Sequence, residues 1–303
     1  QTAAERGAAV LNYARVFSLV KNADGAVGGV NFIDEESGPV FQARAKVVVN
    51  ATGAFCDAVR KMADRRAENL VEPSQGIHLV FAREFLPTDH AIMIPHTADG
   101  RVLFAIPWLG ATLVGTTDTP VGKAELEPEA LDEEIEFILE TAGKYLHKRP
   151  RRADVLSVFT GIRPLVKAVG GAKNTAALAR DHLIEISDAK LVTLTGGKWT
   201  TYRRMAEDCV NQAAGLAKLP EKDCRTQNLK IHGFTENTER FGDLAIYGAD
   251  AIEIQKLIEA DESLGAKLHA DLPYTKAEAV WTIRNEMART VEDVLARRTR
   301  ALF

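Results

Sequence analysis

The sequence predicts a mixed fold, α+β with α/β elements, that is divided into more than one domain. Three observations predict it: an apolar strand that runs into a glycine turn and a helix, a long series of short strands, and a helical stretch at the C-terminal end. A length of 303 residues is typical of about two domains.

Composition and charge narrow the classes of function. A net charge of −4 is unlike a nucleic-acid-binding protein, which is usually basic, so we expect no nucleic-acid partner. The three cysteines, Cys56, Cys209 and Cys224, form no C-x-x-C pair, so we expect reduced thiols and no metal site. No apolar run approaches the roughly 18 residues that cross a bilayer, and the first residues lack the order of a signal peptide.

Residues 1–73 are expected to form the first segment. Short β-rich runs separated by turn residues predict meander strands up to residue 45, beginning with a strand over residues 8–20. The apolar run 46–50 predicts a strand buried on both faces. A helix over residues 55–63 follows the turn Ala51-Thr52-Gly53. Strand, glycine turn and helix together indicate part of a nucleotide-binding domain.

Residues 74–195 are expected to form a substrate-binding domain. One helix, with an apolar stripe from Leu131 to Leu146, interrupts a series of short strands. The predicted strands are residues 78–81, 91–95, 102–107, 112–117, 155–160, 182–187 and 191–195. The pattern indicates a mixed antiparallel sheet with a crossing helix.

Two helical segments complete the predicted organisation. Residues 196–220 carry a strong helix that follows the glycine pair and returns the chain to the first domain. Residues 221–303 predict a separate helical domain, in which Thr275 and Glu278 have the spacing of a capping box.

The glycine pair Gly196-Gly197 is the first candidate functional feature. Glycines let a backbone approach a ligand closely, and a helix is expected to start at about Thr200. The unpaired amides at a helix start would stabilise negative charge on a cofactor ring. A tight turn with a threonine cap explains the same pattern equally well.

Three cations near predicted strand ends form the second candidate. Arg163 lies between a strand and a proline, and its planar fork can bind a carboxylate or a phosphate, although a structural salt bridge is the alternative. With Arg180 and Lys198 it would suit a dianionic phosphate. His78 opens a strand after a glycine and could act as a base, although a lone histidine is more often structural.

Several segments together resemble the FAD-dependent glycerol-3-phosphate dehydrogenases, and in order they cover nearly the whole chain. The segments are residues 46–57 (KVVVNATGAFCD), 75–80 (QGIHLV), 106–118 (IPWLGATLVGTTD), 160–165 (TGIRPL), 180–184 (RDHLI), 195–205 (TGGKWTTYRRM) and 287–303 (MARTVEDVLARRTRALF). The pair GIRPL and GGKWTTYR with the final segment is specific; the other motifs are shared with related flavin oxidases.

The resemblance implies a glutathione-reductase-like FAD domain, formed in part by residues 1–73 and 196–220, beside the substrate and helical domains. It implies that FAD contacts Ala51, Thr52, Gly53, Gly196, Gly197, Lys198, Thr200 and Thr201. It implies substrate binding by Arg163, Arg180 and Lys198, and catalysis by His78, Arg163 and Lys198, with His78 as the base.

The implied reaction is oxidation of sn-glycerol 3-phosphate to dihydroxyacetone phosphate, with hydride transfer to FAD and electrons passed to a quinone, or to oxygen. The family's G-x-G-x-x-G segment is not found, so we expect the chain to begin within a fold, to hold FAD weakly by itself and to be inactive alone.

The expected location is the cytoplasm, peripheral on the inner face of the cytoplasmic membrane. There the basic residues 148–152 would contact lipid unless they are only a solvated loop. A homo-oligomer is left open.

Two alternatives to this function remain. A related FAD-dependent amino-acid or hydroxy-acid oxidase or dehydrogenase would use Arg163 for a carboxylate and would leave Arg180 without a purpose. The other alternative is that residues 221–303 form a non-catalytic helical interaction module.

Overall fold

A computed structural model describes residues 1–95, 97, 100–167 and 182–302. The chain forms two compact units: the larger is Tyr13–Cys224, and the smaller combines Gln1–Asn12 with Arg225–Phe303. Residues 1–12 therefore group with the C-terminal helices, whereas the sequence placed them with the first segment. None of the described helices is long and apolar enough to cross a membrane.

A three-stranded antiparallel meander opens the larger unit. It consists of β1 (Ala14–Lys21), β2 (Val27–Asp34) and β3 (Val40–Arg44), in the order β1-β2-β3. The first strand begins at Ala14, so the prediction of a strand from residue 8 was wrong at its start. The turn between β1 and β2 uses Gly25, whose φ of +83° is easily reached only by glycine.

A second sheet carries the predicted glycine turns. It has the order β11-β12-β4 and consists of β11 (His182–Ile186), β12 (Leu191–Gly196) and β4 (Val48–Asn50). β4 and β12 are parallel, and β11 is antiparallel to β12. The expected burial of β4 on both faces was wrong, because Val49 is 44% exposed and β12 is the one strand paired with β4 among the described residues.

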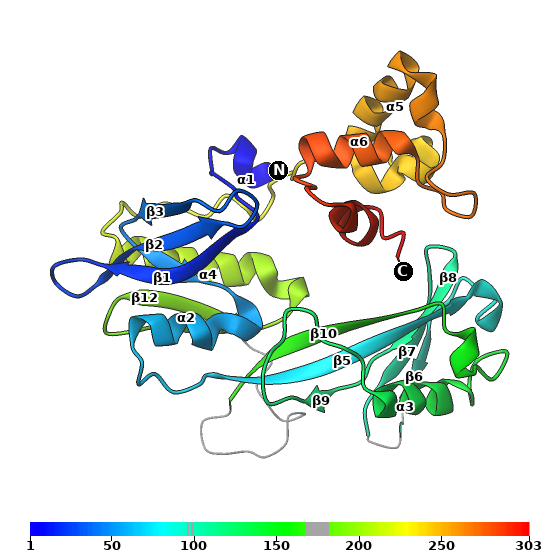
Figure 1. Ribbon diagram of the computed structural model, residues 1–303, viewed down its shortest axis with the longest axis horizontal. Helices are drawn as coiled ribbons and strands as arrows, with labels where there is room; N and C mark the ends of the chain where they lie inside the picture. Colours follow the sequence, from blue (N-terminus) through cyan, green and yellow to red (C-terminus); the bar gives the residue numbers. More distant parts are fainter. Residues whose placement is uncertain (96, 98–99, 168–181, 303) are drawn as a thin grey trace. The chain divides into compact units, whose positions relative to one another are not determined.

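Two helices flank this sheet (Figure 1). The turn after β4 leads through the 3-10 helix η1 (Gly53–Phe55) into α2 (Cys56–Ala63). β12 leads through the 3-10 helix η5 (Trp199–Thr201) into α4 (Tyr202–Leu216). A small core of Val27, Ala63 and Leu191 joins the meander, α2 and β12.

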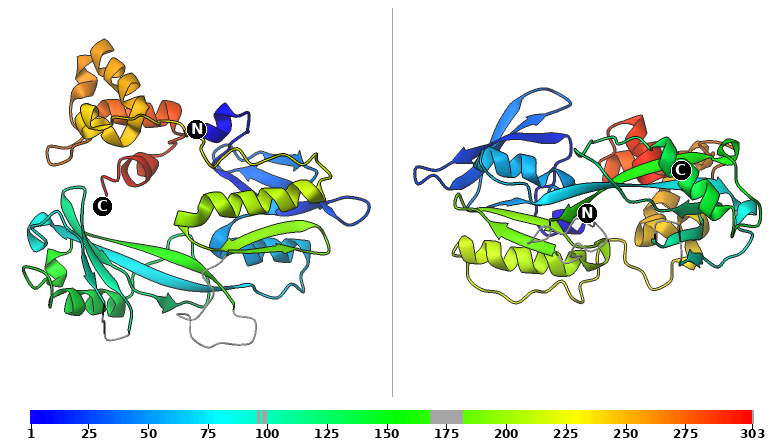
Figure 2. Two further views of the ribbon diagram at one scale, coloured as in Figure 1. Left: turned by 180° about the vertical axis from the view of Figure 1, so that it is seen from behind. Right: turned by 90° about the horizontal axis from the view of Figure 1, so that it is seen from below.

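The largest sheet is antiparallel and has the order β10-β5-β8-β7-β6, with β9 paired to β5. Its strands are β5 (Val71–Ala82), β6 (Ile92–Ile94), β7 (Leu103–Trp108), β8 (Ala111–Gly115), β9 (Thr119–Pro120) and β10 (Ser157–Val166). β5 and β10 are long and run side by side, in register from Ser157 opposite Val80 to Val166 opposite Val71 (Figures 1 and 2).

The two faces of this sheet have different roles. Helix α3 (Asp132–Ala142) packs on one face, where alternate residues of β5, including Ile77, Leu79 and Phe81, are fully buried with Ile138. Because successive side chains of a strand point to opposite faces, Ser74, Gly76 and His78 lie on the other face. The helix therefore covers one side and leaves the other for polar residues.

The smaller unit is helical, as the sequence predicted for its C-terminal part. Its elements are α1 (Thr2–Glu5), η6 (Glu239–Asp250), α5 (Ala251–Ala260), η7 (Glu262–Gly265), α6 (Lys276–Asn285) and η8 (Asp293–Arg298). Tyr247, Ile254 and Ala277 belong to its core. The predicted capping box at Thr275 and Glu278 is present at the start of α6.

A histidine ties α1 to the rest of the helical unit. His232 Nδ1 lies 2.5 Å from Glu5 Oε1, and Nε2 lies 2.7 Å from Asp250 Oδ2. The backbone amide of His232 also donates to Thr2 Oγ1 at 2.8 Å. The hydrogen bond to Glu5 raises the pKa of His232 above its ordinary value; partial burial opposes the shift and Asp250 supports it. The protonated ring can donate to both carboxylates at once.

Stability of the helical unit should therefore depend on pH. A raised pKa in the folded state means that the stabilisation by His232 is full below the ordinary histidine pKa and is lost as pH rises through the raised pKa. We expect His232→Gln to lower the melting temperature clearly at pH 6 and much less at pH 9. The exposed His269, changed to Gln, is the matched control. A His232→Gln effect that is equal at both pH values would contradict this account.

Candidate functional site

The face of the large sheet opposite α3 borders a cleft of about 710 Å³. Its lining residues come from β6, β7, β10, the segment after β8 and the turn after β12. Those used below are Arg101, Thr116, Asp118, Arg163, Gly197 and Lys198. Residues from both the predicted substrate domain and the glycine turn therefore meet in one space.

Arg163 occupies the wall of the cleft between β10 and β5. It is opposite Ser74 in the strand register, and its guanidinium extends over Gly76. Nη2 donates to Thr116 Oγ1 at 2.9 Å, and Nη1 donates to the carbonyl of Gln75 at 3.3 Å. Burial is the main cause that lowers the pKa of Arg163, but guanidinium groups stay protonated in proteins. The side chain thus presents a fixed positive charge.

Asp118 is the acidic neighbour of this guanidinium. Its Oδ1 lies 3.5 Å from Arg163 Nη1, and the hydroxyl of the buried Ser74 donates to the same carboxylate oxygen. Arg101 adds a second cation, with Nη2 3.8 Å from Asp118 Oδ2 and a hydrogen bond from Nη1 to the Asp118 carbonyl. Arg101, Asp118 and Arg163 therefore form one charged group of two guanidinium groups and one carboxylate.

The segment after β8 faces two ways because its side chains alternate. Thr116 and Asp118 face Arg163, whereas Thr117 and Thr119 each donate a hydrogen bond to Glu134 Oε1 at 2.7 Å. The segment thus joins the cleft to α3, the helix that carries Glu134.

Glu134 anchors that segment from behind the sheet. Besides the two threonines, it accepts hydrogen bonds from Gln75 Nε2 at 2.8 Å and from the Leu131 amide at 3.1 Å. Burial raises its pKa, but the hydrogen bonds outweigh burial and hold the pKa below its ordinary value. A buried carboxylate with four donors is satisfied as an anion, so it fixes the segment that contacts Arg163.

His78 lies on the same face of β5, two residues beyond Gly76. Its ring stacks on Phe159 of β10, with ring centroids 5.0 Å apart and an interplanar angle of 8°. On its other side it lies over Gly115, its partner in the register of β8. Burial, and secondarily the positive charge of Arg163, lowers the pKa of His78. The imidazole is therefore neutral at pH 7 and able to accept a proton.

The glycine turn brings a further cation to the cleft. Gly196 ends β12 with a φ of +76°, and Gly197 follows with a φ of +73°, so this turn requires glycine. Lys198 is exposed and lines the cleft with Gly197. The predicted helix start at Thr200 is instead the 3-10 helix η5, in which Thr201 Oγ1 donates to the Lys198 carbonyl at 3.0 Å, and α4 begins at Tyr202.

The other predicted cofactor segment, Ala51-Thr52-Gly53, joins β4 to α2. It leads into η1, which lies against β10 and β12, the strands that carry Arg163 and Gly196. Gly53 has a φ of +59° and no heavy atom within 4 Å of the position that a side chain would take. The segment therefore exposes backbone beside the strands of the cleft.

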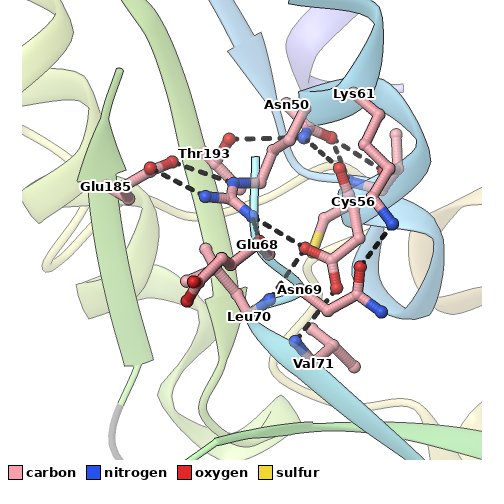
Figure 3. A network of polar contacts seen from close by, with 12 residues as sticks. Asn50, Cys56, Lys61, Glu68, Asn69, Leu70, Val71, Glu185 and Thr193 are labelled. Atoms are coloured by element: carbon pink, nitrogen blue, oxygen red, sulfur yellow. Dashed lines mark hydrogen bonds and ion pairs between the residues drawn. The ribbon is translucent and has the colours of Figure 1, made fainter. Parts of the chain in front are cut away.

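A polar network holds this segment (Figure 3). The buried Asn50 donates to the Cys56 carbonyl at 2.9 Å and to Thr193 Oγ1 at 3.3 Å. It accepts a hydrogen bond of 2.7 Å from the Thr52 hydroxyl. One amide side chain thus fixes the turn at both ends and ties it to β12.

The same network connects α2 to the long strand β5. Arg60, which is 8% exposed, makes paired hydrogen bonds of 3.0 and 2.9 Å to Glu185 of β11, and these raise its pKa. Asp57 accepts from Arg60 and from the amides of Leu70 and Val71, at 2.9 to 3.0 Å. Neighbouring elements of both sheets are therefore coupled through two charged residues of one helix.

The structure brings three of the residues proposed from sequence into one cleft. Arg163, Gly197 and Lys198 line this cleft. His78 lies on the same face of β5 but is not among the residues that line it, and Gly53 begins η1, which touches β10 and β12. Arg180 lies outside the described residues. Sequence reasoning assigned no role to the following residues: Arg101, Thr116, Asp118 and Glu134. The alternation of the segment Thr116-Thr117-Asp118-Thr119 could have placed Thr116 and Asp118 on one face, but the sequence gives no comparable signal for Arg101 or Glu134.

Comparison with known proteins identifies the family. Residues 1–203 match the model of the FAD dependent oxidoreductase family, and residues 187–303 match the C-terminal domain of alpha-glycerophosphate oxidase. The chain therefore belongs to the FAD dependent oxidoreductases, and it has their mixed α and β fold.

Individual relatives belong to a narrower class of protein than the FAD dependent oxidoreductase family as a whole. A mitochondrial glycerol-3-phosphate dehydrogenase of Arabidopsis thaliana is 38% identical over 333 residues, which cover 100% of this chain and 53% of that protein. The mitochondrial glycerol-3-phosphate dehydrogenase of Homo sapiens is 38% identical, with 100% of this chain and 45% of that protein covered. The chain thus spans about half the length of the curated relatives it matches.

A solved structure agrees with these relatives. The glycerol-3-phosphate dehydrogenase from Bacillus halodurans, complexed with FAD, superposes with a TM-score of 0.83 at 29% identity. The superposition covers 99% of this chain and 62% of that one. The fold and both units of the present chain thus have counterparts in a flavoprotein.

The position of His78 leads to a prediction about its pKa. Because burial is the first cause of the lowering and Arg163 the second, Arg163→Ala should raise the pKa of His78 while leaving it below the ordinary value of 6.5. Titration of ring-labelled histidines by NMR measures this shift.

The matched control is Arg83→Ala, which removes a cation that pairs with the exposed Asp89. It should leave the His78 pKa unchanged. A His78 pKa above the ordinary histidine value in the unaltered protein would show that the ring is not in the buried position described.

Proposed function

We propose that the protein containing this chain oxidises sn-glycerol 3-phosphate to dihydroxyacetone phosphate with FAD as cofactor. The observation that carries this proposal is the meeting of Arg163, Arg101 and Lys198 beside the turn at Gly197. Membership of the FAD dependent oxidoreductases supports the cofactor, and the relatives called glycerol-3-phosphate dehydrogenases support the substrate.

The charge of the cleft suits a phosphate monoester. Such a group carries nearly two negative charges at neutral pH and has several acceptor oxygens. The guanidinium of Arg163 offers N–H donors and a positive charge, and the ammonium of Lys198 offers a point charge from the turn after β12. A carboxylate, with a single charge, would use fewer of these cations. Binding of the phosphate would fix the position of the C2 hydroxyl, and orientation of this kind contributes most to catalysis.

His78 is proposed as the base for the C2 hydroxyl. Its lowered pKa keeps the ring neutral, so a nitrogen lone pair is available at pH 7. The nearby positive charges of the cleft would stabilise an alkoxide as the proton leaves. FAD, when bound, supplies the acceptor for the hydride from C2.

The proposed residues fit the flavin by the shape of their backbone. Three glycines with positive φ, Gly53, Gly196 and Gly197, lie in turns beside the cleft strands, where a flat ring could approach the chain closely. We propose that Ala51, Thr52, Thr200 and Thr201, with these glycines and Lys198, surround the ring.

The electron acceptor and the cellular location are two further proposals. We propose a quinone as acceptor and a peripheral position on the inner face of the cytoplasmic membrane. The basic residues 148–152 are partly neutralised, since Lys148, Arg151 and Arg152 pair with Glu84, Asp154 and Asp132. Membrane contact therefore needs more than this stretch.

The proposal is tested with the full gene product. It should be purified yellow, and addition of sn-glycerol 3-phosphate should bleach the flavin and reduce an artificial dye. Colourless protein, or a flavin that glycerol 3-phosphate does not reduce, would contradict the proposed function.

Arg180→Ala separates the proposal from oxidation of an amino acid or a hydroxy acid. If Arg180 holds the phosphate, KM for glycerol 3-phosphate should rise by roughly 10-fold or more, since a charged hydrogen bond contributes about 1.5–3 kcal/mol. Arg66→Ala, which removes a side chain that is 94% exposed, is the control. An unchanged KM for Arg180→Ala, with turnover of a carboxylate substrate instead, would favour the alternative.

A further inference from the structure

Two glycines of the large sheet lie directly against the side chains that the proposed reaction needs. Gly76 of β5 lies under the guanidinium of Arg163, and Gly115 of β8 lies against the ring of His78. We propose that both are positioning residues: Gly76 sets where the phosphate-binding charge lies, and Gly115 sets where the base lies. This inference rests on the function proposed above.

The space at Gly76 is filled by Arg163. A Cβ built on Gly76 would lie 2.7 Å from Arg163 Cζ and closer still to Nη2, which no real side chain tolerates. The backbone of Gly76 has no positive φ, so space, and not conformation, requires glycine here. With the guanidinium flat on the strand, its nitrogens reach the Gln75 carbonyl and the Thr116 hydroxyl.

The space at Gly115 is filled by His78. A Cβ on Gly115 would lie 2.7 Å from His78 Cγ and 2.8 Å from Nε2. Here too φ is not positive. Phe159 stacks on the ring, so the imidazole is confined between an aromatic ring and a bare stretch of backbone.

The two sites should respond differently to an added methyl group. The guanidinium is the end of a long flexible side chain, so it can move away at little cost to the fold. The His78 ring has two torsions and is confined by Phe159, so it can move only by disturbing the sheet. Substitution of Gly76 should therefore affect binding, and substitution of Gly115 should affect turnover and stability.

The first experiment is a double-mutant cycle on the full, flavin-loaded protein. Gly76→Ala should raise KM for glycerol 3-phosphate about 10-fold and change kcat less than about 2-fold. The double variant Gly76→Ala/Arg163→Ala should be no worse than Arg163→Ala alone, because Gly76 acts only through Arg163. An unchanged KM in Gly76→Ala, or losses that multiply in the double variant, would overturn the assignment.

The second cycle uses Gly115→Ala and His78→Ala. Gly115→Ala should lower kcat about 10-fold, with a smaller change in KM, and lower Tm. Removal of the ring relieves the collision, so Gly115→Ala/His78→Ala should melt near His78→Ala even if the single glycine variant does not fold. A double variant that melts as low as Gly115→Ala, or that is also unfolded, would show that Gly115 does not act through His78.

Gly122→Ala is the matched control. This glycine belongs to the same unit, has no positive φ and has no heavy atom within 4 Å of the position that an added methyl group would take, so both kinetic constants and Tm should stay unchanged. Loss of the proposed function would appear differently, as an unaltered protein without glycerol 3-phosphate activity. In that outcome neither the proposed function nor the positioning roles of Gly76 and Gly115 would hold.

Discussion

The close contact between the Arg163 guanidinium and the backbone of β5 determines the geometry of the cleft. A positive charge lies flat on a strand only where that strand lacks a side chain and offers an acceptor, and Gly76 and the Gln75 carbonyl of β5 meet these conditions. The Thr116 hydroxyl, from the segment after β8, is a second acceptor. A long arginine side chain otherwise has many rotamers, whose loss on ligand binding costs free energy. Packing over Gly76 removes that freedom before a ligand arrives, which is how a sheet can provide a preorganised anion site.

Behind this contact, the arrangement depends on two buried polar groups. Glu134 holds the segment after β8 from the α3 side, and Arg60 with its carboxylate partners connects α2 to β11 and to the start of β5. Well-packed apolar residues can often replace a buried ion pair with little loss of stability, so we do not expect a compact core to depend on the Arg60 network. The effect of the two polar groups is positional: Glu134 places the segment that contacts Arg163, and the Arg60 network places α2, the helix that follows the turn proposed for the flavin.

Features that depend on neighbouring residues were predicted well from the sequence. Strand lengths and contacts between distant residues were missed where they depend on strand pairing. Arg163, His78 and Lys198 stood out because each lies within two residues of a proline or a glycine. β5 was predicted over residues 78–81 but spans Val71–Ala82, because Pro73 and Gly76 read as breakers and only pairing with β10 keeps them extended. Asp118 and Glu134 were missed because their partners are far away in sequence: Ser74 is 44 residues from Asp118, and Gln75 is 59 residues from Glu134. Such contacts follow from register, which one sequence does not reveal.

The central claim is that charges from a strand and from a neighbouring turn bind one small phosphorylated alcohol. The most direct measurement is a crystal structure of the flavin-loaded protein with glycerol 3-phosphate. The account predicts phosphate oxygens within hydrogen-bonding distance of both the Arg163 guanidinium and the Lys198 ammonium, with the C2 hydroxyl next to His78. A phosphate bound elsewhere, with Arg163 and Lys198 contacting only protein or solvent, would contradict it.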